Sequence, residues 1–217
     1  MMNISKWLGK TFVTFGDSIT WYDGQTYNEG DKEFGTVVKG YQTYMRQKLG
    51  ATVINEGFNG YKMPQINTVI KAYDFTGVDA VTITAGANDF RYQSTEPLGT
   101  VQAIGSTFDN TTYIGALQES IEYILGQNTE IKIYLLTPVK GWENVIGIMP
   151  ENYPNAVKEL GKLYSLSVCD WYYESGINDL TKLTYIGDVE NNGYNLHPST
   201  KGYERMANIL IPFLENN

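Results

Sequence analysis

The chain is poor in the side chains that build metal sites and covalent cross-links. Its 217 residues include one cysteine, Cys169, and one histidine, His197. A single cysteine excludes an internal disulfide framework. A single histidine argues against a metal hydrolase, because such sites usually combine several imidazoles and carboxylates. We therefore expect neither a metal nor another cofactor.

Positive charge is also scarce. The chain has 16 Lys and Arg against 24 Asp and Glu, a formal net charge of −8, and its basic residues form no cluster that would track a phosphate backbone. No apolar run reaches the length of a membrane span, and the N-terminus lacks the basic-then-apolar pattern of a signal peptide. We expect no nucleic-acid partner and no membrane segment. A cytoplasmic protein, or part of a larger phage or cell-surface protein, fits these features.

Short apolar runs alternate along the chain with stretches of helical periodicity. This pattern is typical of βα units around a parallel sheet, and the length fits one α/β domain over residues 1–217. Several strands are apolar on both faces, as in a sheet that helices cover on each side. The predicted strands are 11–15, 52–55, 79–84, 131–136 and 166–169, and the predicted helices are 35–49, 64–74, 112–126, 154–165 and 199–214.

Residues that could carry chemistry follow the ends of three predicted strands. Ser18 follows the first strand, Gly60 the second and Asn88 the third. The carboxyl ends of parallel strands meet at one edge of the sheet, so these residues should lie close together. A serine nucleophile needs a neighbouring base, and the imidazole of His197 has an ordinary pKa suited to that task near neutrality.

Four segments together resemble the conserved blocks of the SGNH (GDSL-like) hydrolases. They are Gly16-Asp17-Ser18-Ile19-Thr20, Asn55-Glu56-Gly57-Phe58-Asn59-Gly60, Gly86-Ala87-Asn88-Asp89 and His197-Pro198. They occur in the order of the family, and the resemblance covers essentially the whole chain. It implies an α/β three-layer sandwich with a central five-stranded, mainly parallel sheet of the flavodoxin-like type.

The resemblance also implies a serine esterase. Ser18 would attack an ester carbonyl while His197 accepts its proton, and the oxyanion would be bound by the backbone N–H groups of Ser18 and Gly60 and by the Asn88 amide. A side chain at Gly60 would crowd the approach of the backbone to the substrate. The stretch 18–24 also looks like SGNH domains of phage tail and cell-surface proteins of Gram-positive bacteria.

The position three residues before His197 departs from the family pattern. The family usually has an aspartate there that orients the imidazole, and this chain has Tyr194. Candidate substitutes are a backbone carbonyl, the amide oxygen of Asn195, and the carboxylates of Asp188 and Glu190. We expect a Ser–His dyad aided by a carbonyl, with Asp188 as the alternative third member of a triad.

The remaining polar residues of the four blocks have structural explanations. We expect Asp17 and Asp89 to hold loops by accepting hydrogen bonds from backbone N–H groups. Asn55 and Gly57 are predicted to form a turn.

Aromatic residues in the loops suggest the substrate. Aromatic faces with polar tips suit a sugar ring better than a fatty chain, so we expect short-chain or acetyl esters on a carbohydrate. The predicted substrate-binding wall consists of Trp21, Tyr22, Tyr27, Phe90, Tyr92, Trp142 and Tyr194.

Two other functions compete with this hypothesis. A nucleotide-binding domain of the same architecture is disfavoured because no Gly-x-x-x-x-Gly-Lys-Ser/Thr loop follows the first strand. The stronger alternative is a catalytically weakened carbohydrate-binding or structural module, which Tyr194 and the 17 tyrosines favour. Retention of Ser18, Asn88 and His197 argues for the enzyme.

Overall fold

A parallel sheet organises the fold of the computed structural model, which describes residues 4–92, 97–143, 147–188 and 194–217. Its strands run in the order β2-β1-β3-β4-β7, and every neighbouring pair is parallel. The strands are β1 (Thr11–Gly16), β2 (Thr52–Gly57), β3 (Ala80–Thr84), β4 (Lys132–Leu136) and β7 (Ser167–Cys169). Each overlaps one of the five predicted strands.

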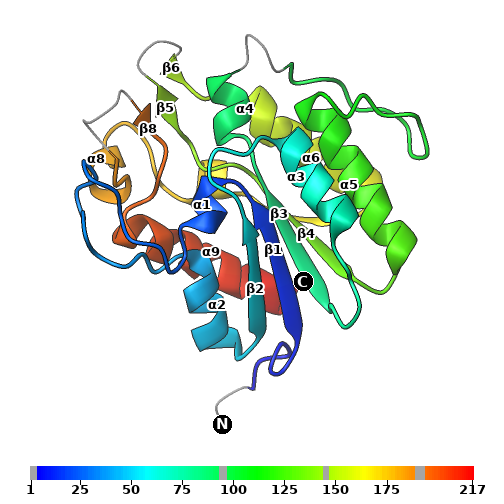
Figure 1. The fold of residues 1–217 in the computed structure, drawn as a ribbon, viewed down its shortest axis with the longest axis horizontal. Coiled ribbons are helices and arrows are strands. Elements are labelled where there is room, and N and C mark those ends of the chain that lie inside the picture. The colour runs from blue at the N-terminus through cyan, green and yellow to red at the C-terminus, as the bar shows by residue number, and fades with distance from the viewer. Residues whose placement is uncertain (1–3, 93–96, 144–146, 189–193) are drawn as a thin grey trace.

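Helices cover both faces of this sheet, which forms the middle of three layers (Figure 1). One face carries α2 (Tyr41–Leu49) and α9 (Thr200–Asn216), and the other carries α3 (Met63–Ala72), α5 (Tyr113–Gln127) and α6 (Asn152–Tyr164). Successive residues of β1 point to opposite faces, so Phe12 joins one buried cluster while Val13 and Phe15 join the other. The predicted α/β fold with a five-stranded parallel sheet is confirmed.

Local sequence signals fix several helix ends. Gly50 ends α2 in the left-handed conformation, with φ of 65°, and donates its N–H to the carbonyl of Arg46. Ser199 precedes α9 and its hydroxyl accepts from the Gly202 N–H at 3.2 Å. The first long helix begins at Tyr41 rather than at residue 35.

Short elements crowd the carboxyl edge of the sheet, at the top of Figure 1. They lie in segments predicted as loops, because elements of two to five residues are too short to show a periodicity. They are α1 (Ser18–Trp21), α4 (Ala87–Arg91), α7 (Trp171–Glu174), α8 (Lys182–Tyr185), and the antiparallel strands β5 (Trp142–Glu143), β6 (Gly147–Ile148) and β8 (Tyr194–Asn195).

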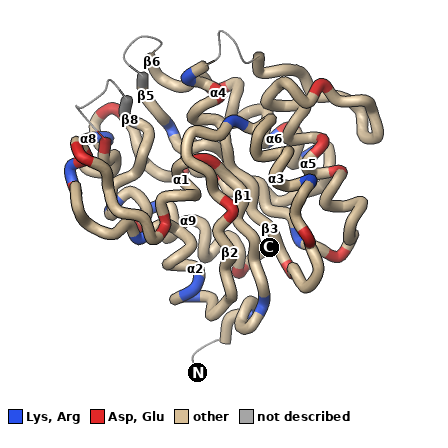
Figure 2. The backbone as a smooth tube through the Cα atoms, in the orientation of Figure 1, with Lys and Arg blue, Asp and Glu red and all other residues tan. Residues whose placement is uncertain are grey.

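Acidic and basic residues are interspersed along the described backbone (Figure 2). Among the described helices, none combines the length and apolar character needed to cross a membrane. Within the same residues, no group of three or more His, Cys, Asp and Glu side chains is arranged to hold a metal ion.

Candidate active site

Ser18 lies at the carboxyl edge of the sheet, where β1 gives way to α1. Asp17 caps this helix, and its Oδ1 accepts from the N–H of Ile19 at 2.9 Å. The abrupt change from strand to helix presents the Ser18 hydroxyl at the point where the strand order reverses between β1 and β3.

His197 contacts this serine directly. Its Nε2 lies 2.8 Å from the Oγ of Ser18, although 179 residues separate them in the chain. The loop that carries the imidazole is anchored by the Oη of Tyr27, which donates to the carbonyl of Pro198 at 3.0 Å. The predicted pair of nucleophile and base is therefore brought within hydrogen-bond distance.

Asp188 holds the other side of the imidazole. Its Oδ2 lies 3.0 Å from Nδ1 of His197. Its Oδ1 accepts from the backbone N–H groups of Leu196 at 3.0 Å and His197 at 3.1 Å. The expectation that a carbonyl serves as the partner of Nδ1 is therefore wrong, and the alternative third member, Asp188, occupies that position.

Backbone pairing explains how a residue nine positions upstream reaches the histidine. Residues 185–188 run beside residues 196–199: the Gly187 N–H donates to the His197 carbonyl at 2.8 Å and the Ser199 N–H donates to the Tyr185 carbonyl at 2.8 Å. This antiparallel pairing sets Gly187 opposite His197 and brings the next residue, Asp188, beside the imidazole. Glu190, another candidate partner, lies outside the described residues, as does the side chain of Asn195.

The environment of His197 changes its basicity. Burial lowers the pKa of the imidazole, but the hydrogen bond and charge of Asp188, with more distant charges of Asp17 and Asp31, outweigh this effect. The net result is a pKa raised above the ordinary 6.5. A raised pKa makes His197 a stronger acceptor for the proton of Ser18.

Gly60 and Asn88 lie on the same cavity as Ser18. The Nδ2 of Asn88 donates one N–H to the carbonyl of Tyr61 at 2.9 Å, which ties α4 to the loop after β2. Gly60 has a φ of +79°, while a Cβ built there meets nothing within 4 Å. The backbone conformation is therefore one reason for glycine at this position, and the crowding of a substrate by a side chain here stays a prediction.

Asp17 and Asp89 are buried carboxylates beside the site, and both bind backbone N–H groups. Asp89 accepts from the N–H of Met63 with both oxygens, at 3.1 and 3.2 Å. Burial raises the pKa of Asp17 to about 6 and that of Asp89 to about 7, against the opposing effect of these backbone donors. The contacts agree with the predicted loop-holding role, and Asp89 fixes the end of the loop that carries Gly60.

Asn55 and Gly57 shape the end of β2. The Oδ1 of Asn55 accepts from the Gly57 N–H at 2.9 Å, and its Nδ2 donates to the Thr20 carbonyl at 2.9 Å. A Cβ at Gly57 would lie 2.3 Å from the backbone nitrogen of Trp21, so only glycine allows β2 to approach α1 this closely.

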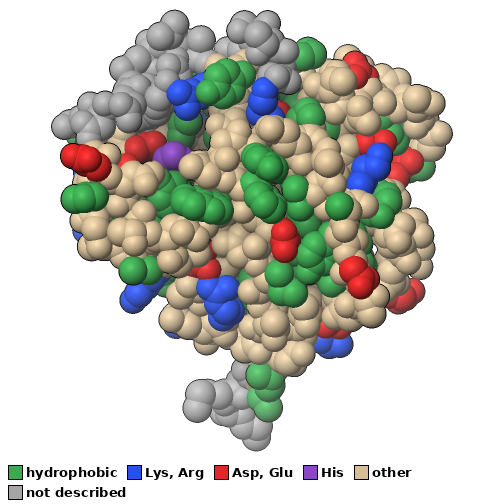
Figure 3. All heavy atoms as spheres, in the orientation of Figure 1, with side chains coloured by type: hydrophobic (Ala, Val, Ile, Leu, Met, Phe, Trp, Pro, Cys, Tyr) green, Lys and Arg blue, Asp and Glu red, His purple; other side chains and the backbone are tan. Residues whose placement is uncertain are grey.

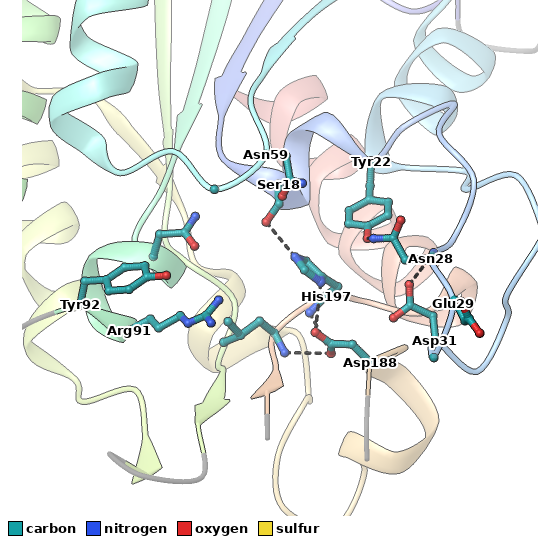
Figure 4. Close-up of a pocket in the computed structure, with 14 residues that line it drawn as sticks. Ser18, Tyr22, Asn28, Glu29, Asp31, Asn59, Arg91, Tyr92, Asp188 and His197 are labelled. Carbon is teal, nitrogen blue, oxygen red and sulfur yellow. Dashed lines mark hydrogen bonds and ion pairs between the residues drawn. The ribbon is translucent and has the colours of Figure 1, made fainter. Parts of the chain in front are cut away.

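A cavity of about 550 Å³ opens at these residues. Because the chain has one histidine, the purple atoms in Figure 3 mark the imidazole, which is reached from the face shown. Most lining side chains are polar (Figure 4). The lining residues are Ser18, Tyr22, Asn28, Glu29, Gly30, Asp31, Asn59, Gly60, Asn88, Arg91, Tyr92, Asp188, Leu196 and His197.

The predicted aromatic wall is only partly present. Tyr22 and Tyr92 line the cavity, and Trp21, which packs against Tyr22, does not. The prediction that Phe90 and Trp142 belong to this wall is wrong. Phe90 is 0% exposed and packs in the core, and Trp142 is 8% exposed; neither lines the cavity.

Trp142 is held away from the cavity by a hydrogen bond from its Nε1 to Asp179 at 2.9 Å. Tyr27 is buried as the anchor of the His197 loop. The side chain of Tyr194 lies outside the described part of the structure.

Sequence reasoning did not single out Asn28, Asp31 and Arg91 as site residues. No motif marks these residues, because their place in the cavity depends on how the loops fold over the edge of the sheet.

The fold is similar to that of several solved structures. A protein from Lactobacillus plantarum is 19% identical, with a TM-score of 0.75 and coverage of 97% of this chain and 98% of that one. A possible lipase from Chitinophaga pinensis is 22% identical, with a TM-score of 0.68 and coverage of 95% and 98%. A lipase/acylhydrolase from Enterococcus faecalis is 20% identical, with a TM-score of 0.61 and coverage of 95% and 96%.

These likenesses show a shared fold and lend no support to the phage-tail or cell-surface association suggested by residues 18–24. No curated protein matches the chain. The model of the GDSL-like lipase/acylhydrolase family matches residues 14–205, a span that includes Ser18, Gly60, Asn88, Asp188 and His197. The chain therefore belongs to the GDSL-like lipase/acylhydrolase family.

Proposed function

We propose that this ester hydrolase is a serine esterase that removes acetyl or other short acyl groups from a carbohydrate. The observation that carries the proposal is the continuous contact from Asp188 through His197 to Ser18, with separations of 3.0 Å and 2.8 Å, at the floor of a polar cavity. This is the arrangement needed to activate a hydroxyl nucleophile.

The three side chains have distinct roles in the proposed reaction. Ser18 Oγ attacks the ester carbonyl as Nε2 of His197 takes its proton, and the carboxylate of Asp188 stabilises the resulting imidazolium. The imidazolium then protonates the departing alcohol. Water, activated by the same imidazole, hydrolyses the acyl-enzyme and restores Ser18.

The oxyanion is proposed to bind the N–H groups of Ser18 and Gly60 and the side-chain amide of Asn88. The Asn88 amide has two N–H bonds, and its contact with the Tyr61 carbonyl uses one of them. The second can serve the oxyanion, and the first holds the amide in place before substrate arrives. Such preorganised donors stabilise the charge that develops in the transition state.

The character of the cavity supports a small acyl group and a polar alcohol. Its wall combines carboxylate, amide and guanidinium groups with two tyrosines. Among the lining residues that the structure describes, Leu196 has the only aliphatic side chain. A long acyl chain would gain little here, because its methylenes need apolar walls to leave water. Hydroxyl groups of a sugar would find many hydrogen-bonding partners.

The alternative of a catalytically weakened binding or structural module was based on Tyr194 in place of the aspartate before His197 and on the abundance of tyrosine. Asp188 supplies a carboxylate at hydrogen-bond distance from Nδ1, at 3.0 Å. This contact favours the enzyme over the binding module.

A series of p-nitrophenyl esters from C2 to C12 tests the proposed acyl preference. We expect kcat/KM to be highest at C2 to C4 and to fall with longer chains. An apolar acyl pocket would instead add about 0.8 kcal/mol, or roughly fourfold, for each buried methylene. A kcat/KM that rises through C8 and C12 would contradict the short-chain proposal while leaving the esterase assignment intact.

Replacing Asp188 by asparagine tests the third member of the triad. We expect kcat to fall by about 10⁴, because an amide cannot stabilise the imidazolium and disturbs the tautomer of His197. The contacts with Asp188 are the largest effects that raise the pKa of His197, so the acid limb of kcat/KM should also move to lower pH. Asp179→Asn, an exposed aspartate outside the cavity, is the matched control; equal activity of the two variants would exclude Asp188 from catalysis.

A further inference from the structure

The catalytic cavity has opposite charges on its two sides. Asn28, Glu29 and Asp31, from the loop between α1 and α2, lie on one side of the Ser18–His197 pair (Figure 4). Arg91 and Tyr92, at the end of α4, lie on the other side. None of these residues belongs to the sequence blocks that identified the family.

Asp31 lines this cavity, and among the described residues only one of its two carboxylate oxygens accepts a hydrogen bond. Its Oδ2 accepts from the N–H of Asn28 at 2.9 Å, and within the described residues no hydrogen bond reaches its Oδ1. The side chain is half-buried. This oxygen is not among the fully buried unpaired side-chain atoms of the described residues, so water can reach it, and a hydroxyl group of a bound molecule can take the place of that water.

The segment that carries Asp31 is fastened to the catalytic residues. The Nδ2 of Asn28 donates to the Oη of Tyr22, and the Tyr22 ring lies 4.9 Å from the imidazole of His197, between centroids. The backbone N–H of Lys32 donates to the carbonyl of Gly187 at 2.9 Å, next to Asp188. The position of Asp31 relative to the triad is therefore set before substrate arrives.

Asp31 lies on the histidine side of the cavity, away from Arg91 and Tyr92 (Figure 4). Burial raises the pKa of Asp31, the N–H of Asn28 opposes this, the charge of Asp188 raises it further, and His197 lowers it. The leaving alcohol must also lie on this side, because it receives its proton from Nε2 of His197. Because an acetyl group is small, the alcohol portion makes up most of the proposed substrate, and it lies on the side of the cavity that contains Asp31.

We propose that Asp31 accepts a hydrogen bond from a hydroxyl group of the alcohol portion, so that the enzyme selects esters of sugars or polyols over simple alkyl esters. This inference rests on the proposed esterase function and identifies a residue that determines its specificity. A site built to bind a hydroxyl group discriminates against an analogue that lacks one, because the acceptor in the site then loses its partner when the substrate displaces water.

The test compares 6-O-acetylglucose with ethyl acetate, which share the acyl group. Both are measured at a pH well above the pKa of His197, so that loss of the Asp31 charge does not change the ionisation of the base. We expect Asp31→Ala to lower kcat/KM for 6-O-acetylglucose by about 10- to 100-fold, mainly through KM, and to change ethyl acetate less than twofold. Asp31→Asn should lose less, since its amide oxygen still accepts from a hydroxyl group.

Asp74→Asn is the matched control, because Asp74 is an exposed aspartate that binds the N–H of Thr76 in the connection between α3 and β3. Equal losses on both substrates would show that Asp31 acts through His197 and would overturn the inference. Acetylcholine, a cationic acetate ester without a free hydroxyl group, is measured as a third substrate. A loss of activity confined to acetylcholine would overturn the inference in favour of charge recognition.

Binding to Ser18→Ala separates this inference from the esterase proposal. Titration of Ser18→Ala with 6-O-acetylglucose, followed by NMR, should show a dissociation constant that rises about 10-fold or more when Asp31→Ala is added. If no ester is turned over by the wild-type protein, the esterase proposal fails, and this titration still decides the role of Asp31. Identical binding with and without Asp31 would overturn it.

Discussion

Ser18→Ala is expected to lower kcat/KM for p-nitrophenyl acetate by roughly a millionfold, the loss typical of a removed serine nucleophile. The Oγ of Ser18 is the atom that lies 2.8 Å from Nε2 of His197, and alanine leaves the imidazole without a hydroxyl to activate. The small remaining rate would come from the oxyanion donors and from substrate binding. Initial rates with the purified variant and the wild-type protein provide the measurement.

Ser167→Ala provides the matched control for this prediction. It removes a hydroxyl from the start of β7, at the opposite edge of the sheet, where Ser167 Oγ contacts Asn217 at 3.3 Å. Circular dichroism should show both variants folded, and a fluorophosphonate should label the wild-type protein and Ser167→Ala but not Ser18→Ala. Normal turnover by folded Ser18→Ala would reject the serine mechanism.

His197→Gln is expected to cost a similar factor, about 10⁶ in kcat, because no other imidazole is present to accept the proton. Catalysis requires the neutral imidazole, so wild-type kcat/KM should fall as the pH falls through the pKa of His197. Asp188 outweighs burial and raises that pKa, so the midpoint of the acid limb should lie above 6.5. The measurement is kcat/KM of the wild-type protein and of His197→Gln from pH 5 to 9.

The single histidine allows this ionisation to be observed directly. The imidazole resonances in an NMR titration belong to His197 without further assignment, and their midpoint should match that of the kinetic acid limb. Added imidazole should restore part of the activity of His197→Ala by occupying the space of the missing ring. A wild-type acid limb retained in His197→Gln would assign the base to another group.

The strands of the central sheet were predictable because their signal is local. Runs such as residues 79–84 and 131–136 are apolar on both faces, and the structure covers both faces of the sheet with helices. The caps at Gly50 and Ser199 are equally local, because each depends on one residue and its immediate backbone. The short helices α1 and α4 escaped prediction, although they carry Ser18 and Asn88.

The aromatic wall shows why composition is a weaker guide than position. Phe90 and Trp142 follow the ends of strands, as Tyr22 and Tyr92 do, yet they point into the core. Successive residues of a helix face different directions, so Phe90 of α4 is buried while Arg91, the next residue, lines the cavity. Because α4 has only five residues, no periodic pattern in the sequence shows which of them is buried. Residue type alone does not distinguish these cases.

The alternation of apolar runs with helical stretches was enough to predict the parallel sheet, because strands joined through helices run parallel. The places of Ser18, Gly60 and Asn88 after strand ends then indicated that they meet at its carboxyl edge. The partner of the imidazole was decided by tertiary structure. Asp188 reaches His197 because two segments separated by an intervening stretch of chain pair through their backbones, and the same packing brings Asp31 beside them. Neither the backbone pairing of residues 185–188 with 196–199 nor the hydrogen bond between Lys32 and Gly187 leaves a periodic trace in the sequence, so only the folded chain reveals them.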